Sequence, residues 1–162
     1  MGHRLTVFAV LSVLSITMAG GAGAQTPPTP AAAPPPIATA DSETPGVQLQ
    51  VTKLKRLGDS VMLQFVLINN SDSSYDPQKL DGSGKGYRNA DGVFLLDLAG
   101  KKKYEVVRDS DQQCLCSHDL QPISAKSRLN VWAKFPAPPE NVKKLGVVVP
   151  HFLPMDDVAL SQ

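Results

Sequence analysis

The sequence has few of the residues that would place it in a specialised class of protein. Its 162 residues include only two cysteines, which excludes a small scaffold held together by many disulfides. Its formal net charge is +1, whereas nucleic-acid-binding proteins normally carry a clearly basic face. We therefore expect no nucleic-acid partner. Because 42% of the residues are hydrophobic, a fully disordered chain is also excluded.

The first 24 residues are typical of a secretory signal peptide. Arg4 supplies a positive charge, residues 7–18 are apolar, and residues 22–24 (Ala-Gly-Ala) form the small-residue pattern of a cleavage site. The apolar stretch is shorter than the about 20 residues of a transmembrane helix, and no cysteine follows it for a lipid anchor. We expect cleavage before Gln25, an exported (periplasmic or secreted) protein, and no transmembrane segment in the mature chain. The alternative is an uncleaved N-terminal anchor.

Residues 25–46 form a Pro/Ala-rich segment that we predict to be a disordered linker. Proline restricts the backbone φ angle and has no N–H to donate, and alanine and threonine offer little apolar surface for a core. We interpret the segment as a spacer, while a stalk or a proline-rich ligand for another protein stays open. The prolines are Pro27, Pro28, Pro30, Pro34, Pro35, Pro36 and Pro45.

Residues 47–162 show the pattern of short β-strands. Val47, Leu49 and Val51 alternate with polar residues, which indicates a half-buried strand. No stretch shows a persuasive helical period, so a parallel α/β architecture is excluded. About seven strands separated by turn residues predict an antiparallel β-sandwich, with a small barrel as the alternative. The other expected strands cover residues 61–67, 93–98, 104–108, 129–135, 145–149 and 158–160.

Residues 71–92 form the longest expected connection between strands. The segment is polar and contains several glycines, and connections of this length are either functional or mobile. Tyr75 and Tyr87 stand near its two ends, and we expect both to pack against the sandwich.

Several segments together resemble a family of exported bacterial proteins. These segments are GVFLLDLAGKKKY (92–104), VRD (107–109), CLCS (114–117), WAKFPAPP (132–139), VVVP (147–150) and DV (157–158). They are similar to segments of immunoglobulin-like β-sandwich domains of uncharacterised function, and the likeness covers residues 47–160. The resemblance implies an immunoglobulin-like fold and an exported location. Some members also carry an OmpA-like peptidoglycan-binding domain, for which this sequence has no counterpart.

Cys114 and Cys116 are the most informative local feature. In an oxidising compartment such a pair tends to form a disulfide, which is the interpretation we favour. His118 follows two residues later, and two thiolates with an imidazole are also suitable ligands for copper or zinc. A metal site made by Cys114, Cys116 and His118, or a thiol-redox function, therefore remains an alternative.

The sequence does not contain a recognisable catalytic set. Only His118 and His151 remain after export, and no Gly-x-Ser-x-Gly motif is present. We therefore expect a non-enzymatic protein with no catalytic residue and no cofactor.

Candidate contacts with a partner are an aromatic residue and a short basic run. Trp132 alternates with Val131 and Ala133, so it points to the opposite side of its strand. We expect residues 135–139 to cover it, with an exposed partner anchor as the alternative. Lys101, Lys102 and Lys103 form a basic hairpin tip that is able to contact an anionic glycan or lipid headgroup. The expected partner is an envelope protein or a cell-wall component.

Overall fold

The computed structural model describes Gly2, residues 35–82 and residues 84–162. The predicted signal peptide, apart from Gly2, and residues 25–34 of the predicted linker lie outside these residues and stay predictions. Among the residues described, no helix has the length and apolar character needed to cross a bilayer.

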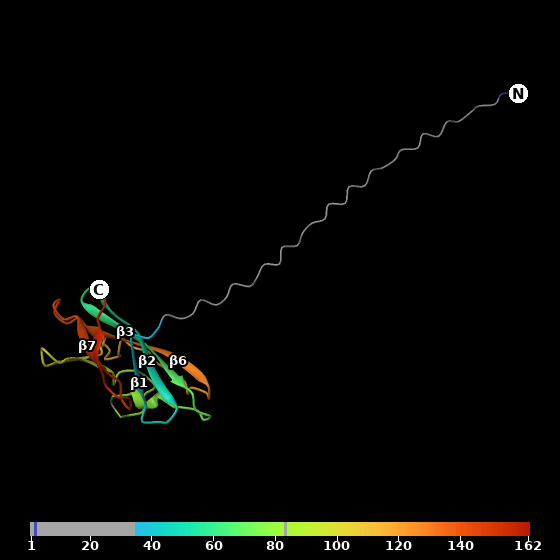
Figure 1. The fold of residues 1–162 in the computed structure, drawn as a ribbon, viewed down its shortest axis with the longest axis horizontal. Helices are drawn as coiled ribbons and strands as arrows, with labels where there is room; N and C mark the ends of the chain where they lie inside the picture. The colour runs from blue at the N-terminus through green and yellow to red at the C-terminus, as the bar shows by residue number, and fades with distance from the viewer. Residues whose placement is uncertain (1, 3–34, 83) are drawn as a thin grey trace. The chain divides into compact units, whose positions relative to one another are not determined.

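Four antiparallel strands form the first sheet, in the spatial order β1-β2-β3-β6 (Figure 1). A two-residue turn at Gly58 and Asp59 joins β2 to β3, and the positive φ of Gly58 suits a residue without a side chain. The full register of β3 on β6, from Ser60↔Pro136 to Asn69↔Ser127, makes this the longest uninterrupted pairing. The bounds are β1 Ala38–Asp41, β2 Val47–Leu57, β3 Ser60–Asn69 and β6 Ser127–Pro136.

Four further antiparallel strands form the second sheet, in the order β5-β4-β7-β8. The hairpin β4–β5 turns at Gly100 and Lys101, and Asp97 accepts a hydrogen bond from the Gly100 N–H at 2.8 Å. The prediction of an all-β, antiparallel fold is confirmed. The bounds are β4 Phe94–Asp97, β5 Lys102–Glu105, β7 Lys144–Val148 and β8 Met155–Ala159.

Alternation along the strands builds one apolar core that both sheets share. In β3, every second side chain from Val61 to Leu67 is buried, and the residues between them are half-buried on the outer face. Full burial of such side chains contributes about 1.5–3 kcal/mol each. The largest fully buried residues come from both sheets, with Leu80 added from the connection between them: Phe65, Phe135, Leu49, Leu54, Leu63, Leu67, Leu80, Leu95 and Leu145.

The last part of the predicted linker is folded, so placing its end at Gly46 is wrong. β1 lies within residues 25–46 and pairs with β2 from Ala38↔Val51 to Asp41↔Gln48. Residues 37–44 contain no proline, so their N–H groups are free to join the sheet, and Ala40 is buried.

The connection from residue 71 to 92 is anchored at its first tyrosine but not at its second. Tyr75 is buried, and its N–H and carbonyl both bond to Ile123. Tyr87 is 54% exposed, so the expectation that it packs against the sandwich is wrong. The 3-10 helix η1, Pro77–Leu80, begins behind Asp76, whose carboxylate accepts the Gln78 N–H at 3.1 Å.

Candidate functional site

Residues 114–117 lie along the outer edge of β6 and act as a short additional strand. Cys116 forms an antiparallel bridge with Ala133, and the Lys134 N–H donates to the Leu115 carbonyl at 2.9 Å. These bonds satisfy part of an otherwise free sheet edge.

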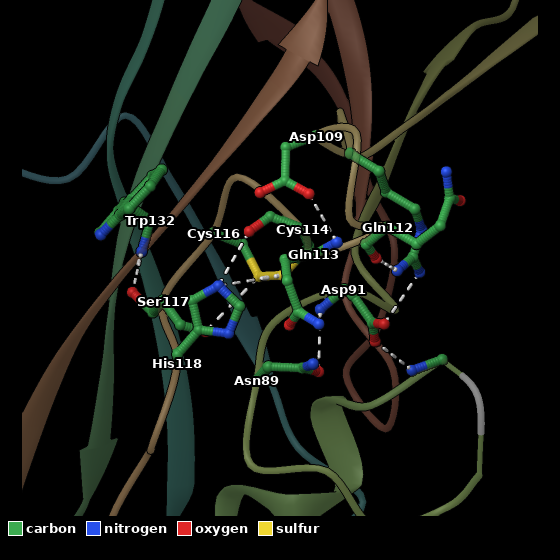
Figure 2. The surroundings of a disulfide bond; sticks show 12 residues. Asn89, Asp91, Asp109, Gln112, Gln113, Cys114, Cys116, Ser117, His118 and Trp132 are labelled. Atoms are coloured by element: carbon green, nitrogen blue, oxygen red, sulfur yellow. Dashed lines mark hydrogen bonds and ion pairs between the residues drawn. A yellow bond between two sulfur atoms is a disulfide. The ribbon is translucent and has the colours of Figure 1, made fainter.

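Ser117 of the same segment holds the backbone of Trp132, and Figure 2 shows its hydroxyl beside the Trp132 backbone nitrogen. The Ser117 N–H donates to the Trp132 carbonyl at 2.9 Å, and the Trp132 N–H donates to the Ser117 hydroxyl at 3.0 Å. Paired backbone groups leave Trp132 little freedom to shift along the strand. The segment that contains the cysteines therefore positions the tryptophan.

Cys114 and Cys116 form a disulfide, as predicted. Their Cα atoms are 5.3 Å apart, and the two residues are 2% and 1% exposed. A buried disulfide is shielded from attack by external thiolates, which need access to a sulfur atom. Its surroundings therefore favour a structural function.

His118 approaches the disulfide but is bonded to the backbone. Its Nε2 atom lies 2.8 Å from the Cys114 carbonyl and 3.8 Å from the Cys114 Sγ. Since a carbonyl only accepts, Nε2 carries the proton in this hydrogen bond and has no lone pair for a metal. The three possible ligand atoms lie within 4.8 Å of one another. Metal binding would need the disulfide to be reduced, and His118 would then bind through Nδ1, or through Nε2 once this hydrogen bond is broken.

A polar cavity of about 490 Å³ lies beside the disulfide and His118. Arg108 contributes to its wall, but its guanidinium pairs with the Asp91 carboxylate at 2.9 Å. Arg88 pairs in the same way with Asp76 at 3.2 Å. His151, the other histidine of the predicted mature chain, instead contacts Glu43 at 2.8 Å.

The outer face of β6 carries Trp132, which is 38% exposed. The expectation that residues 135–139 cover it is wrong. Those residues are held elsewhere, because Arg56 donates to the carbonyls of Pro138 and Pro139 at 2.8 and 3.2 Å. The N–H of Ala137 also donates to Asp59 at 3.0 Å. The proline-rich segment is thus bound to the β2–β3 end of the sheet.

A hollow of about 190 Å³ lies next to Trp132 on this face. Thr52, Gln64 and Asn130 line it with one hydroxyl and two amide groups, and Gln64 is the direct cross-strand neighbour of Trp132. We refer to the outward-facing residues of β2, β3 and β6 around this hollow as the Trp132 face. The face thus combines an aromatic ring with groups that both donate and accept hydrogen bonds.

The basic run 101–103 does not belong to the Trp132 face. Its residues lie on the β4–β5 hairpin of the second sheet. Lys103 pairs with Glu105 at 2.9 Å and lies 4.4 Å from the centre of the Phe94 ring. Lys102 lies 5.1 Å from the centre of the Tyr104 ring. Trp132 and the basic run were both predicted to contact a partner, but the structure places them on different sheets.

The sequence reasoning missed the polar and charged neighbours of Trp132. Gln64 and Asn130 line the hollow, while Lys53 and Lys134 stand close to it in the strand register. One signal was present, because the segments that form β2, β3 and β6 contain no aspartate or glutamate. This absence of acidic residues indicates a basic surface only when the three strands are known to be adjacent in one sheet.

Comparison of the chain with known protein families finds no match, and comparison with curated proteins finds none either.

Proposed function

We propose that this protein is an exported, non-enzymatic domain with an immunoglobulin-like β-sandwich fold. In this proposal, the Trp132 face binds another component of the cell envelope. The two sheets with a shared core support the fold class, and the buried disulfide is of the kind that persists in oxidising compartments. The signal-like residues 1–24 support export.

Trp132 is the observation that carries the binding function. Tryptophan is enriched among the residues that dominate the energetics of interfaces, because its large ring removes much apolar area from water. Here the ring is exposed on a sheet face, while both polar backbone groups of Trp132 bond to Ser117 and its strand pairs with β3 along its whole length. A partner would lose little free energy in ordering this residue.

The proposal is tested by co-sedimentation of the purified protein with insoluble cell-wall material from its own host. The expected result is binding that weakens at least about tenfold in Trp132→Ala, corresponding to a loss of about 1.4 kcal/mol or more. Because Trp132 is the chain's single tryptophan, its fluorescence should also shift to shorter wavelength on binding.

Leu153→Ala is the matched control, because Leu153 is another exposed large apolar residue but lies between β7 and β8. This variant should bind as the unchanged protein does. Equal binding by all three proteins, with no change in fluorescence, would contradict the proposed face. Circular dichroism would establish that both variants keep the fold.

A further inference from the structure

The Trp132 face is positively charged, although the whole chain has a formal net charge of only +1. Lys53 and Lys55 of β2 are at least partly exposed, as are Arg128 and Lys134 of β6. Strands β2, β3 and β6 contain no acidic residue. No salt bridge between described residues involves any of these four cations. Their charges are therefore available to an external anion.

The strand register places the cations around the tryptophan. One row across the sheet reads Lys53, Gln64 and Trp132, and the next reads Lys55, Met62 and Lys134. Lys134 is two residues from Trp132 on the same strand, about 7 Å away, and Lys53 is two strands away, about 10 Å. A ligand lying on the indole ring would reach ammonium groups on two sides.

The hollow beside the ring suits a hydroxyl-rich ligand. The amides of Gln64 and Asn130 each offer two N–H donors and one carbonyl acceptor. The Thr52 hydroxyl donates to the Gln64 backbone carbonyl at 3.2 Å and adds an acceptor. Sugar hydroxyls also donate and accept, so they match such groups better than a purely anionic or purely apolar ligand does. The flat indole ring supplies an apolar surface for the C–H face of a pyranose ring.

We propose that the Trp132 face binds a carboxylated polysaccharide, a chain of pyranose rings with carboxylate groups. This inference rests on the proposed binding function and names its ligand class. The ring stacks on Trp132, its hydroxyls bond to Gln64 and Asn130, and its carboxylates pair with Lys53 and Lys134. Single-stranded nucleic acid is also anionic, but its binding surfaces stack successive bases on several aromatic residues. In β2, β3 and β6 the other aromatic residues, Phe65 and Phe135, are buried in the core.

Three polymers test separately whether binding needs the pyranose rings, the carboxylates or both. Polygalacturonate offers rings and carboxylates, its methyl ester offers the same rings without charge, and polyglutamate offers carboxylates without rings. The purified protein should bind polygalacturonate with a shift in Trp132 fluorescence. It should bind each of the other two at least about tenfold more weakly. Raising the salt concentration should weaken binding to polygalacturonate, because the lysines on this face are at least partly exposed to solvent and its ions.

Charge variants test the position of the site. Lys53→Gln combined with Lys134→Gln should weaken binding to polygalacturonate at least about tenfold and reduce its salt dependence. The matched control is Lys143→Gln combined with Lys144→Gln, which removes the same charge from exposed residues at the start of β7 in the second sheet. This control should bind as the unchanged protein does.

The possible failures are distinguishable. Equal affinity for the methyl ester, equal affinity for polyglutamate, or tighter binding of an oligothymidylate would each overturn the carboxylated-polysaccharide inference. If no polymer binds but cell-wall material still binds in a Trp132-dependent way, the inference fails and the proposed function stands. If binding to cell-wall material does not depend on Trp132, both fail.

Discussion

Asn69 shows how much of the fold depends on one buried polar side chain. It is fully buried at the end of β3, and its amide Nδ2 donates to the carbonyls of Ser73, Ile123 and Ser124 at 2.7, 3.0 and 3.1 Å. Its Oδ1 accepts from the N–H and hydroxyl of Ser71 at 3.0 and 2.6 Å. This residue therefore ties the start of the long connection to the segment that precedes β6.

Asn69→Ala should be among the most destabilising single changes in the domain. It removes every bond of the side chain, although the Ile123 carbonyl keeps the Tyr75 N–H and the Ser73 carbonyl keeps the Ser71 hydroxyl. The loss of the bonds and packing of this buried amide should cost about 2–4 kcal/mol in the free energy of unfolding. Urea unfolding followed by circular dichroism measures this loss. Asn70→Ala is the matched control, because Asn70 is exposed and its hydrogen bonds to described residues use only its backbone, which the change keeps: the N–H donates to Gly46 and the carbonyl accepts from Lys126. Equal effects of the two changes would refute the assigned function of Asn69.

At the scale of elements, the disulfide segment works as an extension of the first sheet. Residues 114–117 pair with β6, and the Leu115 N–H donates to the Val107 carbonyl at 2.7 Å, while the Val107 N–H donates to Lys134 at 2.8 Å. These backbone bonds connect β6 to the chain that follows β5. The Cys114–Cys116 bond closes only a very short loop inside this network. Most of the ordering of the segment is therefore expected from hydrogen bonds and burial.

Reduction of the disulfide should consequently have a small effect. Because the loop that it closes is so short, its loss should cost about 1–2 kcal/mol. Thermal unfolding with and without a dithiol reductant measures this effect, and the fluorescence of Trp132 should stay nearly unchanged before unfolding. Copper(I) or zinc that binds tightly to the reduced protein, and is lost in His118→Ala, would instead favour the metal-site alternative.

At the scale of the whole molecule, the interface between the sheets contains ionisable groups as well as apolar ones. Tyr104 of β5 is buried, and its hydroxyl finds no hydrogen-bond partner in the described part of the chain. Burial raises the pKa of Tyr104 above its ordinary value, the Asp97 carboxylate adds to this rise, and Arg56 of the first sheet opposes it. The folded protein therefore holds this proton to a higher pH than the unfolded chain does.

The stability of the protein should fall at alkaline pH for this reason. Below about pH 10 the phenol is protonated in both states, and above it the unfolded chain loses the proton first, which favours unfolding. Tyr104→Phe should lose less stability than the unchanged protein between about pH 8 and pH 11, as measured by urea unfolding. Tyr75, whose pKa is also raised by burial, accounts for part of the remaining loss.

Tyr104→Phe also has an expected effect on stability near neutral pH, and Tyr87→Phe serves as its control. Removing the buried hydroxyl of Tyr104 should leave stability unchanged or raise it by up to about 1 kcal/mol, because that group makes no hydrogen bond with the described residues. Tyr87→Phe changes an exposed residue and should leave the stability near neutral pH unchanged. A steeper alkaline loss in Tyr104→Phe than in the unchanged protein would contradict this account.

The sequence by itself determined the features that depend on neighbouring residues. Strands such as β3 were predictable because alternation between core and solvent is a property of one strand. The outward direction of Trp132 and the Cys114–Cys116 pairing followed from the same kind of local information. β1 was missed because a four-residue strand beside a proline-rich segment has too few alternating positions to stand out.

Tertiary structure alone decided which strands lie side by side and what surrounds each site. β3 and β6 are separated by more than fifty residues, yet their pairing brings Gln64 beside Trp132 and completes the row with Lys53. The exposure of Trp132 likewise depended on Arg56, which holds the proline-rich segment at the other end of the sheet. Pairing between distant strands depends on how all strands pack around one core. The alternation of apolar and polar residues indicates only which side chains of a single strand face the core and which face solvent.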